Sequence, residues 1–173
     1  MDTSTQTVRI PNHSADFETL EEMEWAFSKG DIEFFKKVLD SRPSIVVRIH
    51  AVCMLADMKN EAAIPLLAEA LREDPSPLVR HEAAFAMGQL EFKSGVPPLI
   101  EAMTTDSSVL VRHESAVALG SIGDERARDG LTKRLVDPDE DVRLSAECAL
   151  ADLDFLKRLR LRTENRPASE SDS

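Results

Sequence analysis

The sequence predicts an all-α solenoid of about four stacked helical hairpins, with an extra helix at its N-terminal end. Residues 111–120, VRHESAVALG, restate residues 79–88, VRHEAAFAMG, 32 positions earlier. Weaker copies begin at Val47 and Val142, so the successive offsets are 32, 32 and 31 residues. A fixed offset of this length is typical of stacked helical repeats. Abundant Ala, Leu, Glu and Arg with only 6 Gly favours helices throughout.

The composition fits one globular domain of 173 residues, and 42% hydrophobic residues exclude a wholly disordered chain. The net charge of −11 disfavours a nucleic-acid or anionic-membrane partner and permits a basic one. No apolar run is long enough for a signal peptide or a membrane span. We therefore expect a cytoplasmic protein.

We expect disordered tails at residues 1–15 and 161–173 around a repeat domain at residues 16–160. Asp16 is predicted to cap a first helix that ends near Gly30, and a short second helix follows at residues 32–39. Each later hairpin should pair a first helix with a second helix that carries the repeated segment. The first helices are expected at 62–72, 96–103 and 127–135, and the second helices at 45–58, 77–90, 109–122 and 140–156.

The two cysteines are predicted to be buried core residues. Cys53 and Cys148 stand six residues after the marker valines, and the same register holds the apolar Phe85 and Val117 in the central repeats. The spacing indicates neither a disulfide framework nor a cysteine-based metal site.

Two further registers predict contacts between hairpins. Small residues, which let neighbouring helices approach closely, recur at Ala56, Gly88, Gly120 and Ala151. Arginines recur at Arg48, Arg80, Arg112 and Arg143, and aspartates stand six residues before the last three of them, at Asp74, Asp106 and Asp137. We expect each aspartate to cap a helix and to bond an arginine of an adjacent repeat. Because Arg42 stands where the first arginine would need an aspartate, this ladder is expected to begin at the second repeat.

The strongest functional signal is the pair His-Glu, present only in the two central repeats as His81-Glu82 and His113-Glu114. Stacked helices lie about 8–10 Å apart, so equivalent histidines can converge on one ion. With Glu114 they would supply two imidazoles and one carboxylate, the ligand set of non-haem iron oxygenases. The alternative is a pair of polar side chains on a concave face.

The other two histidines are not expected to bind the metal. His13 stands in the N-terminal tail, and His50 is displaced by one residue from the histidine register. We interpret His50 as structural.

The stretch from about residue 44 to 156 resembles one half of deoxyhypusine hydroxylase. The resemblance rests on the doubled VRHE segment, on ALGSIGD at residues 118–124 and on the terminal DVRLSAECALADLDFL at 141–156. The repeat frame itself is that of HEAT-like repeats in general, including those of phycobilisome bilin lyases. The specific part of the match is the doubled His-Glu pair.

This resemblance implies a non-haem di-iron monooxygenase that hydroxylates the deoxyhypusine side chain of a translation factor. By resemblance, His81, His113 and Glu114 would be iron ligands. Glu82 would lie beside the irons as a further metal-site residue and as the catalytic residue that holds the amino groups of the substrate. The family carries four His-Glu motifs in one chain, whereas this chain has two, so a homodimer with two irons would complete the site.

Other function classes stay open at this stage. A non-catalytic adaptor would hold a partner protein in the groove of the repeats, and its histidines would be incidental contacts. A bilin-lyase-like chromophore carrier is permitted by the repeat frame, although no particular residue supports it.

Overall fold

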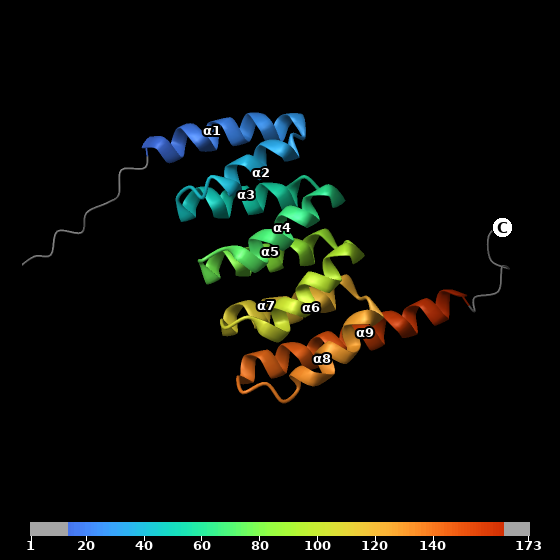
Figure 1. Cartoon of the computed structure of the whole chain (residues 1–173). Coiled ribbons are helices and arrows are strands. Elements are labelled where there is room, and N and C mark those ends of the chain that lie inside the picture. The colour runs from blue at the N-terminus through green and yellow to red at the C-terminus, as the bar shows by residue number, and fades with distance from the viewer. Residues whose placement is uncertain (1–13, 165–173) are drawn as a thin grey trace, which may run out of the picture.

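The protein is an all-α stack of helical hairpins, as the repeat spacing predicts. The structure is a computed structural model that describes residues 14–164 (Figure 1). Within this part, nine α-helices and three short 3₁₀ helices occur, and no strand. The α-helices are α1 (Ser14–Lys29), α2 (Ile32–Asp40), α3 (Ile45–Asp57), α4 (Ile64–Glu73), α5 (Pro77–Leu90), α6 (Val96–Thr105), α7 (Val109–Ile122), α8 (Arg128–Arg134) and α9 (Glu140–Glu164). None of the described helices is both long and apolar enough to cross a membrane.

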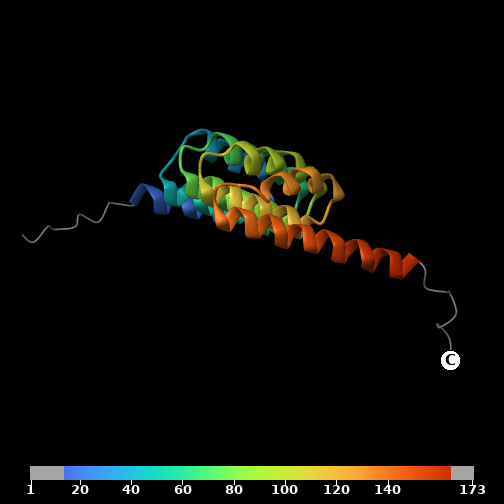
Figure 2. The same cartoon turned by 90° about the horizontal axis from the view of Figure 1, so that it is seen from below.

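The helices form two layers (Figure 2). The odd-numbered layer contains α1, α3, α5, α7 and α9, and each helix packs on its neighbours within that layer. The even-numbered layer contains α2, α4, α6 and α8 and covers one side of the first. Each hairpin therefore contacts mainly the hairpins directly before and after it, as expected for a solenoid.

The hydrophobic core lies between the two layers. Leu67 and Leu99 of the even layer and Met87 and Leu119 of the odd layer are fully buried. Pro65 falls in the first turn of α4, where the missing amide donor breaks no helical hydrogen bond.

The helix boundaries agree with the prediction except at the two ends. The first helix begins at Ser14, so Asp16 lies inside its first turn and is not the capping residue. Gly30 follows that helix with a φ of +67°, a left-handed conformation that glycine adopts at little cost. At the other end α9 continues to Glu164, beyond the predicted end of the repeat domain at residue 160. The expected tails otherwise lie largely outside the described residues.

Glycines in the odd layer permit very close helix contacts. A Cβ placed on Gly88 would lie 2.9 Å from the Cβ of Ala118, and one on Gly120 would lie 3.0 Å from the Cα of Ala149. The first distance is shorter than non-bonded carbon atoms tolerate, and the second would require the neighbouring helix to shift by a few tenths of an ångström. The predicted packing role of the small residues is thus confirmed at these two positions.

The arginine–aspartate ladder is also confirmed, but it begins one repeat earlier than predicted. Each arginine reaches forward to the aspartate of the following repeat. Arg48 Nε donates to Asp74 Oδ2 at 2.7 Å, and Arg80 Nε donates to Asp106 Oδ2 at the same distance. The third pair joins Arg112 Nη2 to Asp137 Oδ1 at 3.1 Å. The expectation that the ladder would begin at the second repeat was wrong because it required an aspartate six residues before the first arginine, whereas Arg48 pairs with Asp74 of the following repeat.

The aspartates also organise the turn between helices, from a position slightly different from the one predicted. Asp106 is the C-cap residue of α6, and its Oδ1 accepts a hydrogen bond from the amide of Ser108, the residue before α7. Burial alone would raise the pKa of Asp106. The hydrogen bonds from Arg80 and Ser108, with the charges of Arg80 and Arg112, outweigh burial and lower that pKa.

Candidate metal centre

The His-Glu pairs lie on the side of the odd layer that faces away from the even layer. In α5, Ala83 and Met87 are buried against the core, whereas the exposed fractions of the His81 and Glu82 side chains are 20% and 25%. Glu114 of α7 is more enclosed, with 11% of its side chain exposed. The marker valine before each pair is fully buried and fixes the rotation of the helix. The two motifs therefore form a partly shielded polar row across α5 and α7.

His81 lies between two carboxylates that come from successive repeats. Its Nε2 is 3.3 Å from Oε2 of Glu114, and its Nδ1 is 3.3 Å from Oε1 of Glu82. The Nδ1 atom is buried and makes no hydrogen bond within the described part of the chain, so its contact with Glu82 is one of proximity only. One imidazole and two carboxylates thus meet where a cation would be electrostatically favoured.

His113 is held in a different way. Its Nδ1 lies 2.7 Å from the hydroxyl oxygen of Ser145, and that hydroxyl donates to the carbonyl oxygen of Asp141 at 2.7 Å. A serine hydroxyl has one hydrogen, so it must accept from His113, which requires the proton on Nδ1. The Nε2 atom of His113 then carries a free lone pair. Hydrogen bonds of this kind orient histidines that bind metals.

Ser145 was not singled out from the sequence, although its register marks it. It stands in the last repeat where Glu82 and Glu114 stand in the central repeats. In both contacts a histidine touches the residue at this register in the following repeat. His50 also occupies this register in the first repeat. It is exposed, and its Nδ1 donates to the carbonyl oxygen of Val46 at 2.9 Å, in keeping with the structural role expected for it.

The donor set fits a metal such as iron, but a single chain does not assemble it. His81, Glu82 and Glu114 come together, whereas His113 points to Ser145. Across residues 14–164, no group of three His, Cys, Asp or Glu side chains has an arrangement that could hold a metal ion. Imidazole and carboxylate ligands suit iron, and the buried Nδ1 of His81 and the free Nε2 of His113 are available donors. The residue types therefore suit iron, but the described part of one chain does not bring three of them around a single point.

The cysteines correct the sequence prediction. Cys53 and Cys148 are exposed and not part of the core. Partial burial, with the nearby charges of Glu82 and Asp57, raises the pKa of the Cys53 thiol. Phe85 and Val117 at the same register are also exposed, at 44% and 40%.

These side chains belong to an apolar stripe that sequence reasoning missed. The apolar stripe consists of Cys53, Leu78, Phe85, Leu110, Val117, Leu144 and Cys148 on the odd layer. Phe85 follows His81 by one helical turn, so the stripe runs beside the His-Glu pairs. Exposed apolar side chains beside polar groups are typical of an interaction site. The sequence signal is the recurrence of apolar residues directly before the marker valines and six residues after them, together with Leu144 at the histidine register, on helix faces that do not contribute to the core.

The repeat spacing and the two layers define an α-helical repeat protein with a polar row across α5 and α7. The sequence profile of HEAT repeats matches residues 32–90 and 64–151, which together span more than half of the chain. The chain belongs to the HEAT repeat family. No curated protein sequence matches it significantly.

Two solved structures resemble the fold. Human deoxyhypusine hydroxylase in complex with glycerol matches with a TM-score of 0.66 and 25% identity over 91% of this chain and 51% of that chain. The complex of CpcE and CpcF of phycocyanin lyase from Nostoc sp. matches with a TM-score of 0.56 and 24% identity over 74% of this chain and 56% of that chain. The second likeness concerns the fold alone. This chain spans about half the length of either structure.

Proposed function

We propose that the protein is a non-haem di-iron, O₂-dependent hydroxylase that resembles deoxyhypusine hydroxylase and completes its site by homodimerisation. The observation that carries the proposal is the His81–Glu114 contact of 3.3 Å between equivalent motifs of stacked repeats. It is supported by the likeness to human deoxyhypusine hydroxylase, of which this chain matches about half. Two irons, when bound, would activate dioxygen.

A twofold pair would bring the same face of each copy together. The apolar stripe would form the dry part of that interface and surround the polar row. His81, His113 and Glu114 of both copies would then be the iron ligands. Shielding by a second copy would exclude water from the site, which strengthens every interaction between charges inside it.

The residues of this chain would also select a cationic substrate. Glu82 has 25% of its side chain exposed, so it can accept hydrogen bonds from an incoming ammonium group while it stays next to His81. The net charge of −11 attracts a basic guest over longer distances. We propose an amine-bearing side chain of a basic protein region as the substrate, such as that of a deoxyhypusine-bearing translation factor.

The test combines the iron content with the molar mass of the purified protein. We expect close to one iron per chain in a dimer, and His81→Ala and His113→Ala should each lose most of the iron without loss of helical content. His50→Ala is the matched control, because it removes an exposed imidazole that touches no carboxylate. A metal-free monomer after reconstitution with ferrous iron under anaerobic conditions would refute the proposal.

A second function is favoured by the apolar stripe. The same exposed surface suits a non-catalytic adaptor that binds another protein along the odd layer. In that case Phe85→Ser would abolish partner binding, whereas His81→Ala would leave it unchanged. A hydroxylase would show iron loss in His81→Ala.

A further inference from the structure

The two ends of the stack carry helical faces of opposite charge that have no partner among the described helices. The C-terminal part of α9 extends past the rest of the stack, and α1 covers the opposite end (Figures 1 and 2). Neither face belongs to the polar row, and the face on α9 continues the side of that helix that carries Cys148 of the apolar stripe, two turns before Phe155. Each combines large apolar side chains with charged ones, which are mainly basic on α9 and mainly acidic on α1.

The exposed side of α9 is basic. Phe155, Arg158, Leu159 and Arg162 follow the spacing of one helical face, and they form what we name the α9 basic face. Phe155 and Leu159 are 64% and 47% exposed. The opposite side of the helix holds it to the stack, because Arg160 Nη2 donates to the carbonyl oxygen of Gly123 at 3.4 Å.

The exposed side of α1 is acidic and aromatic. Phe17, Glu18, Glu21 and Trp25 share one helical face, which we name the α1 acidic face. Phe17 and Trp25 are 66% and 64% exposed, although such large rings are usually well buried. The ammonium group of Lys29 lies 5.9 Å from the centre of the Trp25 ring and covers part of it. The buried side, with Met23, packs towards α3 and α2.

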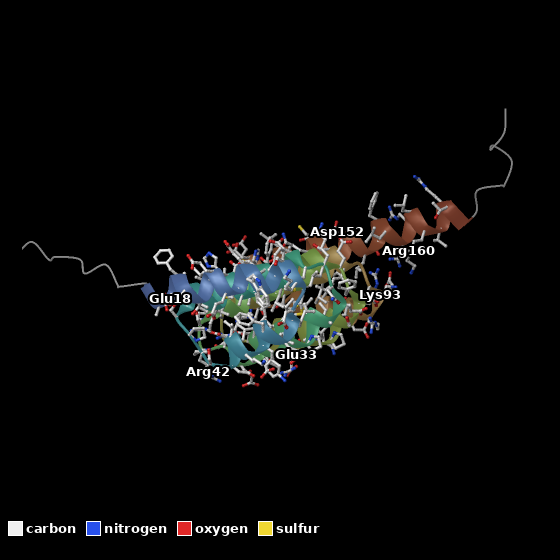
Figure 3. All side chains as sticks on the ribbon, turned by 90° about the horizontal axis from the view of Figure 1, so that it is seen from above. Glu18, Glu33, Arg42, Lys93, Asp152 and Arg160 are labelled. Carbon is white, nitrogen blue, oxygen red and sulfur yellow. The ribbon has the colours of Figure 1, made fainter. Side chains whose placement is uncertain are left out.

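We propose that the α9 basic face of one copy docks on the α1 acidic face of a second copy. One chain cannot make this contact by itself, because the two faces lie at opposite ends of the stack. Figure 3 shows Glu18 on α1 far from Arg160 on the extended part of α9.

The charge distribution selects a second copy as the occupant. At a net charge of −11 whole copies of this chain repel one another, so a basic surface on one copy that meets an acidic surface on another favours their association. Arg158 and Arg162 provide that surface, and both can pair with the carboxylates of α1 or lie over the face of Trp25. Phe155 and Leu159 would cover the aromatic rings. A twofold pair would make this contact twice.

Trp25 is the only tryptophan in the chain, so its emission reports on α1 directly. With the full-length protein at low salt, we expect the emission to shift to shorter wavelength as the concentration rises, together with an increase in molar mass by light scattering. Both changes should weaken as salt is added. The pair Arg158→Glu and Arg162→Glu should weaken self-association by about tenfold or more.

Charge reversal elsewhere provides the matched control. Lys36→Glu with Lys37→Glu changes the net charge by the same amount, but on the exposed surface of α2. This control variant should self-associate with an affinity within about twofold of that of the wild-type protein. Glu18→Arg with Glu21→Arg should also abolish association. Mixing this variant with the α9 variant should restore the Trp25 shift, because the reversed faces are again complementary.

Three outcomes would overturn the proposal: equal loss in the α2 control, no restoration on mixing, or an emission shift at constant molar mass. Emission at the short wavelength at every concentration, with the molar mass of one chain, would instead place Trp25 in a contact within its own chain. The proposal does not depend on the iron site. His81→Ala, which tests the proposed hydroxylase, should leave the Trp25 shift intact.

Discussion

Asp106→Asn should show how much the arginine–aspartate ladder contributes to stability. Arg80 donates to both oxygens of Asp106, at 2.7 and 2.9 Å, and only 13% and 9% of these side chains are exposed. The change leaves the guanidinium poorly solvated and opposite a neutral amide. Loss of one partner of a buried pair costs about 3–5 kcal/mol, and since asparagine keeps one acceptor oxygen, we expect about 2–3 kcal/mol.

Glu101→Gln is the matched control. Its partner Arg72 joins the same two hairpins, but the ion pair is longer, at 3.6 Å, and both side chains are about half exposed. We expect a loss below about 0.5 kcal/mol. Urea unfolding followed by helical circular dichroism should show the midpoint of Asp106→Asn falling by about 1 M with an unchanged slope. Equal midpoints for the two variants would refute the argument that enclosure gives the ladder its strength.

The remaining predictions concern packing, the histidine tautomer and acid stability. Gly120→Ala should destabilise the protein by about 1–2 kcal/mol because its Cβ would lie 3.0 Å from the backbone of α9. At Gly130 an added Cβ would lie 3.2 Å from the flexible end of Met103 and at ordinary contact distance, 3.4 Å, from Ile100, so Gly130→Ala should stabilise the protein by up to about 1 kcal/mol in thermal unfolding. Ser145→Ala should convert His113 from the Nδ1–H form to a tautomer mixture, visible by ¹⁵N NMR of the metal-free protein; an unchanged spectrum would contradict the assigned hydrogen bond. Hydrogen bonds from the Arg126 side chain and amide lower the pKa of Asp124 to about 2, so the ionised carboxylate stabilises the fold above pH 4. Because the arginine is exposed, this contribution to the free energy of unfolding is only about 1 kcal/mol. It should be lost as the pH falls from 4 to 2. The stability difference between wild type and Asp124→Asn should shrink over that interval.

The architecture could be predicted from the sequence because the repeats restate one another. The offset fixed the number of hairpins, and the marker valines fixed which side of each helix is buried. The close approach at Gly88 followed from the recurrence of small residues. A pattern that recurs in several repeats is a stronger signal of buried positions than the pattern of any single helix.

The errors arose where a contact depends on the neighbouring repeat. Cys53 was assigned to the core because its register is apolar, but in this stack that register faces outward beside the His-Glu row. The ladder was predicted to begin at the second repeat because no aspartate precedes Arg48 at the fixed offset, whereas the Arg48 side chain reaches forward to Asp74 of the next repeat. The contact between His113 and Ser145 was missed because it too joins a side chain to a residue of the next repeat. The position of a residue within its repeat does not show whether a long side chain contacts the repeat before it or the repeat after it.

Because Arg48, Arg80 and Arg112 reach forward to their aspartates by 26, 26 and 25 residues, the chain can gain or lose a whole hairpin without a change in this pairing. Excision of residues 64–95, one full offset of 32, would leave Arg48 opposite Asp106 with the pairing intact and would remove one His-Glu motif cleanly. An excision one residue longer or shorter would change the spacing of the junction rung between Arg48 and Asp106 and would leave the later Arg112–Asp137 rung as it is. The number of His-Glu motifs in such a protein can therefore change by duplication or loss of whole hairpins with the ladder preserved.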